Sequence, residues 1–207
     1  MEASARNNIP LIVMDRPNPN AHYVDGPVLD LENQSFVGMH EVPIVYGLTI
    51  GEYATMINKE GWLNNNMKSN LTIIELKNYN RKVTYDLPIL PSPNLPNRKS
   101  INLYPSLCLF EGTNVSAGRG TEMQFQIYGS PYLNKEKNNF RFTPKKNSGS
   151  KYPKHENLLC YGKNLSENKK LNKFDLSFLL NAYSDTNDKQ NFFNNYFDKL
   201  AGTNSLK

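Results

Sequence analysis

The sequence predicts an α/β fold in which part of a parallel sheet precedes a smaller α+β region. Three observations favour this class. The apolar run from Ile9 to Met14 is typical of a strand buried on both faces of a parallel sheet. A capped amphipathic helix and a second apolar segment follow it. Later apolar segments are short, and the chain of 207 residues ends in helical patterns.

The first predicted strand leads into a candidate binding loop. After Met14 the chain becomes polar and is punctuated by two prolines, which indicates a loop. In open α/β sheets, ligands bind beyond the carboxyl ends of the strands. Asp15, Arg16 and Asn18 are therefore candidate site residues. The alternative is an ordinary loop in which Asp15 and Arg16 pair with each other.

A helix is predicted from Thr49 to about Glu60. Thr49 and Glu52 have the spacing of a capping box, and Gly61 is a typical stop. Glu52 is therefore first a capping residue and second a substrate-binding candidate. The apolar face of the helix is expected to contain Ile50, Ala54 and Ile57.

A second strand is predicted at Leu71–Leu76, followed by a stiff loop. Residues 88–96 contain four prolines, which prevent regular structure. This loop is expected to place Ser92 and Asn94 at the site.

The most informative segment is the Gly-rich loop from Leu109 to Thr121. A buried run ends at Glu111, and burial can raise the pKa of such a carboxyl, as a general acid requires. Three glycines let the backbone approach a ligand closely. The alternative is a Gly-rich turn with a solvated glutamate. Donors and acceptors for a polyhydroxyl substrate come from Asn114, Ser116 and Arg119.

The second half of the chain is predicted to be α+β. The expected domains are residues 1–110 and 111–207. Short strands are expected at Gln124–Tyr128, Phe140–Thr143 and Leu158–Tyr161. A terminal αα-hairpin is expected, with apolar faces at Leu176, Leu179, Leu180 and Tyr183 and at Phe193, Tyr196, Phe197 and Leu200.

Composition argues against several functional classes. The net charge is +5, and basic residues are concentrated in residues 135–154. We interpret this stretch as a solvated face, and a nucleic-acid binding surface is the alternative. No apolar run is long enough for a membrane span. Cys108 and Cys160 are expected to be buried free thiols, a single disulfide being the alternative. The three histidines are scattered and do not indicate a metal site. The sequence contains no G-x-G-x-x-G motif, so it gives no sign of a nucleotide cofactor.

The chain is also expected to be the rear part of a larger protein. A doubly buried strand needs parallel neighbours, and these require crossover units of about 30 residues. The rest of the sequence supplies few such units.

Short motifs in a fixed order carry a resemblance to a known family. They include D-R-P-N-P at Asp15, V-D-G-P-V-L-D at Val24, Y-G-L-T-I-G-E at Tyr46, P-S-P-N-L-P at Pro91 and L-F-E-G-T-N-V-S-A-G-R-G-T at Leu109. Over nearly its whole length the chain resembles the NamZ-type exo-β-N-acetylmuramidases. Tyr46 is a departure, because many relatives carry histidine there.

The resemblance implies a secreted or periplasmic bacterial glycoside hydrolase without a cofactor. It implies a Rossmann-like α/β domain joined to a smaller subdomain, and release of N-acetylmuramic acid from the non-reducing ends of peptidoglycan fragments. It also implies a catalytic glutamate in a Pro-Glu-His-Gly segment that this sequence lacks. A non-catalytic protein that binds cell-wall saccharides is the alternative.

Glycoside hydrolysis usually requires two carboxyls. Glu111 is the first candidate from this chain and Asp15 the second. Arg119 is expected to pair with the lactyl carboxylate of muramic acid. The hydroxyls and the acetamido group of the sugar are expected to form hydrogen bonds with Asn18, Asn94, Asn114 and Ser116.

Overall fold

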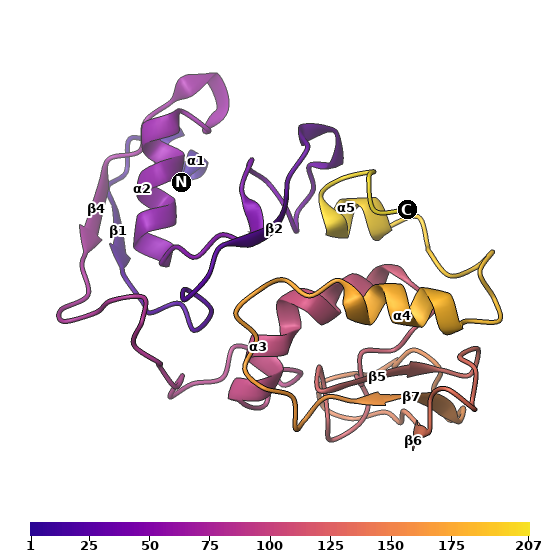
Figure 1. The fold of residues 1–207 in the computed structure, drawn as a ribbon. Coiled ribbons are helices and arrows are strands. Elements are labelled where there is room, and N and C mark those ends of the chain that lie inside the picture. The colour runs from indigo at the N-terminus through magenta and orange to yellow at the C-terminus, as the bar shows by residue number, and fades with distance from the viewer. The chain divides into compact units, whose positions relative to one another are not determined.

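The computed structural model describes residues 1–207, which divide into two compact units (Figure 1). Unit 1 contains Met1–Val24 and Val45–Asp86, and unit 2 contains Asp25–Ile44 and Leu87–Lys207. The mixed α/β class is confirmed, with a parallel strand pair in unit 1 and an antiparallel sheet in unit 2. The domain boundary predicted at residue 110 stays a prediction.

Unit 1 is a β-α-β unit preceded by a short helix, α1 (Glu2–Arg6). β1 (Leu11–Met14) and β4 (Leu71–Ile74) pair in parallel, and α2 (Ile50–Glu60) lies on the connection between them. Figure 1 shows α2 beside both strands. A 3₁₀ turn, η2 (Asn64–Asn66), precedes β4.

The predicted start and stop of α2 are confirmed. Glu52 N donates to Thr49 Oγ1 (3.2 Å), and Thr49 N donates back to the Glu52 carboxylate (2.9 Å). Gly61 ends the helix at φ +72°, a conformation that costs glycine little. The predicted apolar face is partly wrong, because Ile50 is 51% exposed and Gly51 and Ala54 are the buried residues.

The expectation that the first strand is buried on both faces is wrong. Side chains along β1 alternate between half-buried and exposed. Ile12 is 63% exposed and Met14 76%, because α2 covers only the opposite face of the strand pair.

Unit 2 is built around a three-stranded antiparallel sheet with the order β5-β7-β6. The strands are β5 (Ile127–Ser130), β6 (Phe140–Phe142) and β7 (Cys160–Asn164). All three were predicted, but β5 and β7 begin two or three residues later than expected. A separate pair contains β2 (Asp25–Val28) and β3 (Pro43–Val45), and η1 (Leu31–Asn33) lies between them in sequence.

Helices cover this sheet. α3 (Arg98–Leu107) runs into a 3₁₀ turn, η3 (Cys108–Gly112), and packs against α4 (Ser177–Asp185). Stacking of Tyr128 from β5 on Phe110 from η3 (4.9 Å between ring centroids) joins helices and sheet. Both terminal helices were predicted, but α5 (Phe197–Ala201) packs mainly on η3 rather than forming a hairpin with α4.

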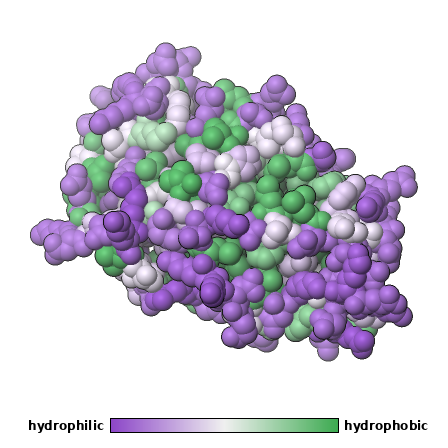
Figure 2. Space-filling model, viewed as in Figure 1, coloured by the Kyte–Doolittle hydropathy of each residue, from purple (hydrophilic) through white to green (hydrophobic).

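No helix is both long enough and apolar enough to cross a membrane. On the face shown in Figure 2, hydrophobic residues are scattered among hydrophilic ones. Single exposed apolar residues of this kind are ordinary for a protein surface.

Candidate functional site

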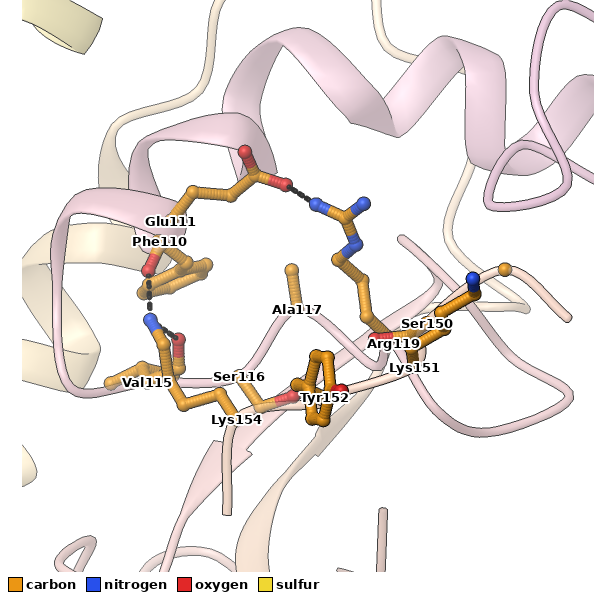
Figure 3. Close-up of a pocket in the computed structure, with 11 residues that line it drawn as sticks. Phe110, Glu111, Val115, Ser116, Ala117, Arg119, Ser150, Lys151, Tyr152 and Lys154 are labelled. Carbon is orange, nitrogen blue, oxygen red and sulfur yellow. Dashed lines mark hydrogen bonds and ion pairs between the residues drawn. The ribbon is translucent and has the colours of Figure 1, made fainter. Parts of the chain in front are cut away.

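A pocket of about 410 Å³ in unit 2 brings Glu111 and Arg119 together (Figure 3). It lies between the Gly-rich loop and residues 149–154. Three of the predicted site residues line it, namely Glu111, Ser116 and Arg119. The complete lining is Phe110, Glu111, Val115, Ser116, Ala117, Arg119, Gly149, Ser150, Lys151, Tyr152 and Lys154.

The loop after Glu111 is held by backbone pairing on two sides. Ser116 and Gly129 exchange two hydrogen bonds of 2.8 and 2.9 Å, which attach the loop to β5. Asn114 N donates to the carbonyl of Phe192 (2.8 Å). Gly112 allows close packing, because a Cβ there would lie 2.7 Å from the Cα of Phe197.

Glu111 and Arg119 form an ion pair at the pocket. Arg119 Nη1 donates to Glu111 Oε1 at 2.6 Å, and the two side chains point toward each other in Figure 3. The side chains are 32% and 41% exposed, so solvent and ligands reach both. The bond is charge-assisted, since both partners are ionisable side chains of opposite charge. Arg119 Nε is buried without a hydrogen-bond partner.

Tyr152 and Lys154 are among the pocket residues that the sequence did not predict. Both lie in the basic stretch that charge pattern alone assigned to a solvated face. Tyr152 is 85% exposed and offers its ring to the pocket. Lys154 is half-buried, and its ammonium donates to the carbonyls of Phe110 (2.8 Å), Thr113 and Val115 (3.1 Å). Nothing in the local charge pattern distinguishes this lysine from its solvated neighbours.

The titration of Lys154 gives a test of its environment. Burial lowers its pKa from 10.5 to about 8; the Glu111 carboxylate opposes this shift and the Arg119 guanidinium adds to it. Between these pH values the folded chain releases a proton that the unfolded chain still holds, so the free energy of unfolding rises with pH. At about 1.4 kcal/mol per pKa unit, this contribution reaches about 3 kcal/mol.

We therefore expect the stability difference between wild type and Lys154→Met to change with pH. The measurement is urea unfolding of both chains at several pH values above neutrality. Wild type should gain stability relative to the variant as pH rises from 8 toward 10.5. A difference that is constant with pH would show that Lys154 titrates normally.

Other predicted residues of unit 2 lie outside the pocket lining. Asn94 Nδ2 donates to the carbonyl of Gly149 (2.6 Å), and so supports the pocket wall from behind. Ser92 Oγ accepts from Asn94 N (3.1 Å) and shapes the Pro-rich loop. Both amide atoms of Asn114 are buried without partners. None of the three contributes a side chain to the lining.

The predicted residues of unit 1 have local structural partners. Asp15 accepts from Thr49 Oγ1 (2.7 Å) and Gly51 N (2.8 Å), and so supports the start of α2. Asn18 Nδ2 donates to Leu48 O (2.9 Å), and the Glu52 carboxylate pairs with Arg81 (2.6 Å). Asp15 accepts from the backbone N of Arg16 (2.9 Å), and no ion pair joins their side chains. The binding roles of these residues stay predictions.

Both cysteines are free thiols. Burial raises the pKa of Cys108 and of Cys160 to about 12. Burial also raises the pKa of Tyr46, which stacks on Tyr53 with 5.0 Å between ring centroids. No group of three or more His, Cys, Asp or Glu side chains is placed to hold a metal ion.

Comparison with known proteins assigns the chain to a family. The model described as "Exo-beta-N-acetylmuramidase NamZ, N-terminal" matches residues 1–99, and its C-terminal counterpart matches residues 102–207. The chain belongs to the NamZ family. The predicted resemblance is thereby confirmed.

Relatives include the peptidoglycan β-N-acetylmuramidase NamZ of Bacillus subtilis, strain 168. It is 40% identical over 182 residues, which cover 78% of this chain and 42% of the relative. The chain thus spans less than half the length of this curated relative.

Two solved structures of DUF1343 family proteins from Bacteroides fragilis have the same fold. One (BF0379) is 47% identical, with a TM-score of 0.94 over 99% of this chain and 58% of that one. The other (BF0371) is 26% identical, with a TM-score of 0.74 over 98% of this chain and 59% of that one.

Proposed function

We propose that this chain contributes to a glycosidase that releases N-acetylmuramic acid from the non-reducing ends of peptidoglycan fragments. The observation that carries this proposal is an ion-paired, accessible carboxylate, Glu111, in an open pocket of a NamZ-family chain. Since the substrate is cell-wall material, we place the protein outside the cytoplasm, secreted or periplasmic.

The pocket suits an anionic sugar. One carboxylate, Glu111, faces three cations, Arg119, Lys151 and Lys154, so the lining carries a net positive charge. A cationic pocket favours a ligand with its own carboxylate, as the lactyl group of muramic acid provides. The exposed ring of Tyr152 offers a flat apolar surface with a polar hydroxyl, which suits an amphipathic sugar ring.

The chemistry assigned to Glu111 follows from its partner. In glycoside hydrolysis one carboxyl protonates the leaving oxygen, and the other activates water or attacks the anomeric carbon. Because Glu111 accepts a charge-assisted hydrogen bond from Arg119 (2.6 Å), we assign it the second role rather than the general-acid role expected from burial alone. The general acid is then a second carboxyl.

Binding selectivity tests this proposal. Calorimetric titration should show tighter binding of N-acetylmuramic acid than of N-acetylglucosamine, which lacks the lactyl group. Arg119→Gln is expected to reduce that preference by about tenfold or more, since hydrogen bonds to charged groups contribute about 1.5–3 kcal/mol.

Arg141→Gln is the matched control. It makes the same charge change on β6, where Arg141 lies over the ring of Tyr161 and outside the pocket lining. Equal affinity for the two sugars in wild type would contradict the proposed substrate class. Binding of muramyl sugars without turnover of a chromogenic muramide would instead favour a non-catalytic binding protein.

A further inference from the structure

Two adjacent side chains, Lys154 and His155, bind the backbone of the loop that follows Glu111. His155 Nε2 lies 2.7 Å from a carbonyl oxygen, and since a carbonyl only accepts, Nε2 carries the proton. Together the two side chains hold four carbonyls of one short segment. These carbonyls belong to Phe110, Thr113 and Val115, bound by Lys154, and to Asn114, bound by His155.

The carbonyls need these partners because of where they lie. The 3₁₀ turn η3 ends at Gly112, and the N–H of Thr113 closes it by donating to the carbonyl of Phe110 (3.1 Å). The carbonyls of Thr113 and Val115 lie beyond the turn and accept none of its N–H groups. Thr113 and Val115 are buried, so water is largely excluded from them. A lysine ammonium is suited to this position, since it supplies three donors and a positive charge at a helix C-terminus.

The segment that carries the pair turns sharply. His155 has φ +60° and Asn157 φ +61°, in the left-handed region that few side chains adopt and that Asn and His tolerate best. Gly120 in the Gly-rich loop makes room for the segment, because a Cβ there would lie 2.5 Å from Pro153.

We propose that Lys154 and His155 are positioning residues that fix the loop carrying Glu111 and Ser116 in the geometry of the pocket. Both act on the loop through its backbone carbonyls, and Lys154 adds its charge to the pocket lining. Backbone pairing also ties the loop, through Asn114 to Phe192 and through Ser116 to Gly129. Without the two side chains, the stretch between Glu111 and Ser116 keeps this backbone pairing but loses the side-chain donors that bind its carbonyls. The effect on sugar binding rests on the proposed function, whereas the effect on the loop does not.

The test combines hydrogen exchange with sugar binding in the 207-residue chain. Lys154→Met keeps a side chain of similar length and removes all three donors. We expect amides of residues 113–119 to exchange about tenfold faster or more, while amides of β7 stay protected. The affinity for N-acetylmuramic acid should fall by about tenfold or more, because the pocket is no longer preorganised. Lys154→Arg keeps the cation and its donors and should restore both properties to within about threefold of wild type.

Lys151→Met is the matched control, since Lys151 lines the same pocket, is exposed and should change the exchange of neither segment. Unchanged exchange over residues 113–119 in Lys154→Met overturns the proposal. An equal increase in the exchange of the β7 amides also overturns it, because Lys154 would then stabilise unit 2 as a whole and not the loop in particular. If that variant does not fold, His155→Phe removes the bond to Asn114 O and a longer contact with Ser130 Oγ (3.4 Å), and it must raise exchange over the same residues. Faster exchange in variants of a chain that binds no muramyl sugar would leave the positioning role intact and reject the proposed function.

Discussion

Glu111→Gln is expected to lower the rate of muramide hydrolysis by at least about 100-fold, the usual contribution of an acid–base group. Glutamine keeps the shape of the side chain but removes the charge and the basic oxygen. Both partners of the Glu111–Arg119 pair are about a third or more exposed, so the same change should alter stability by less than about 1 kcal/mol. A loss of activity without a loss of stability therefore separates catalysis from folding.

The rate is measured as release of a chromophore from a chromogenic β-N-acetylmuramide. It is measured in this chain and, because the chain spans 42% of the Bacillus subtilis relative, also in that relative with its corresponding glutamate replaced. Glu122→Gln provides the matched control, since Glu122 is exposed, follows the same loop and lies outside the pocket lining. A Glu111→Gln rate within about tenfold of wild type would falsify the catalytic role.

Gly162→Ala is expected to destabilise unit 2 by about 3 kcal/mol or more, at the upper end of the cost of overpacking. A Cβ at Gly162 would lie 1.8 Å from the carbonyl oxygen of Tyr128 and 2.7 Å from the Cα of Gly129. These are backbone atoms of the neighbouring strand, so no side-chain rotation relieves the clash. Gly162 and Gly129 are register partners, and the β5–β7 ladder must open to admit the methyl group.

Urea unfolding measures this effect, and Gly38→Ala is its control. A Cβ at Gly38 would make only ordinary contact, at 3.5 Å from a Leu29 methyl carbon, so that change should stay within about 0.5 kcal/mol. Since Gly129 also pairs with Ser116, the Gly162 variant should weaken sugar binding as well. Equal stability of the two variants would show that the strands separate without cost.

The parts of the fold that sequence predicted well are those with local causes. The capping box of Thr49 and Glu52 and the stop at Gly61 depend on residues within one helix, and both are confirmed. Helix α3 was not predicted, and it contains Pro105, a residue that usually breaks a helix. There the capping box of Asn97 and Ser100 starts the helix, and burial of Leu103 and Leu107 against the core outweighs the local cost.

In the candidate site, too, the residues that the sequence predicted are those that lie close together in the chain. Glu111, Ser116 and Arg119 lie in one Gly-rich loop, so the sequence pattern alone pointed to them. Lys154 and Tyr152 reach the pocket only through the tertiary fold, and a charge pattern cannot tell a lysine bound to carbonyls from one in water. The prediction that β1 is buried on both faces was wrong, because an apolar run reports the composition of a strand and not what covers each of its faces.

The backbone ties between the Glu111 loop and distant segments have a consequence for biosynthesis. Asn114 and Gly112 pair with Phe192 and Asn194, which the ribosome adds long after it has made the loop. Contacts between residues so far apart in sequence form slowly. The nascent chain therefore carries its Gly-rich loop without these ties until Phe192 and Asn194 have been made, and Phe110 and Val115, which are buried in the folded chain, are not fully covered before then.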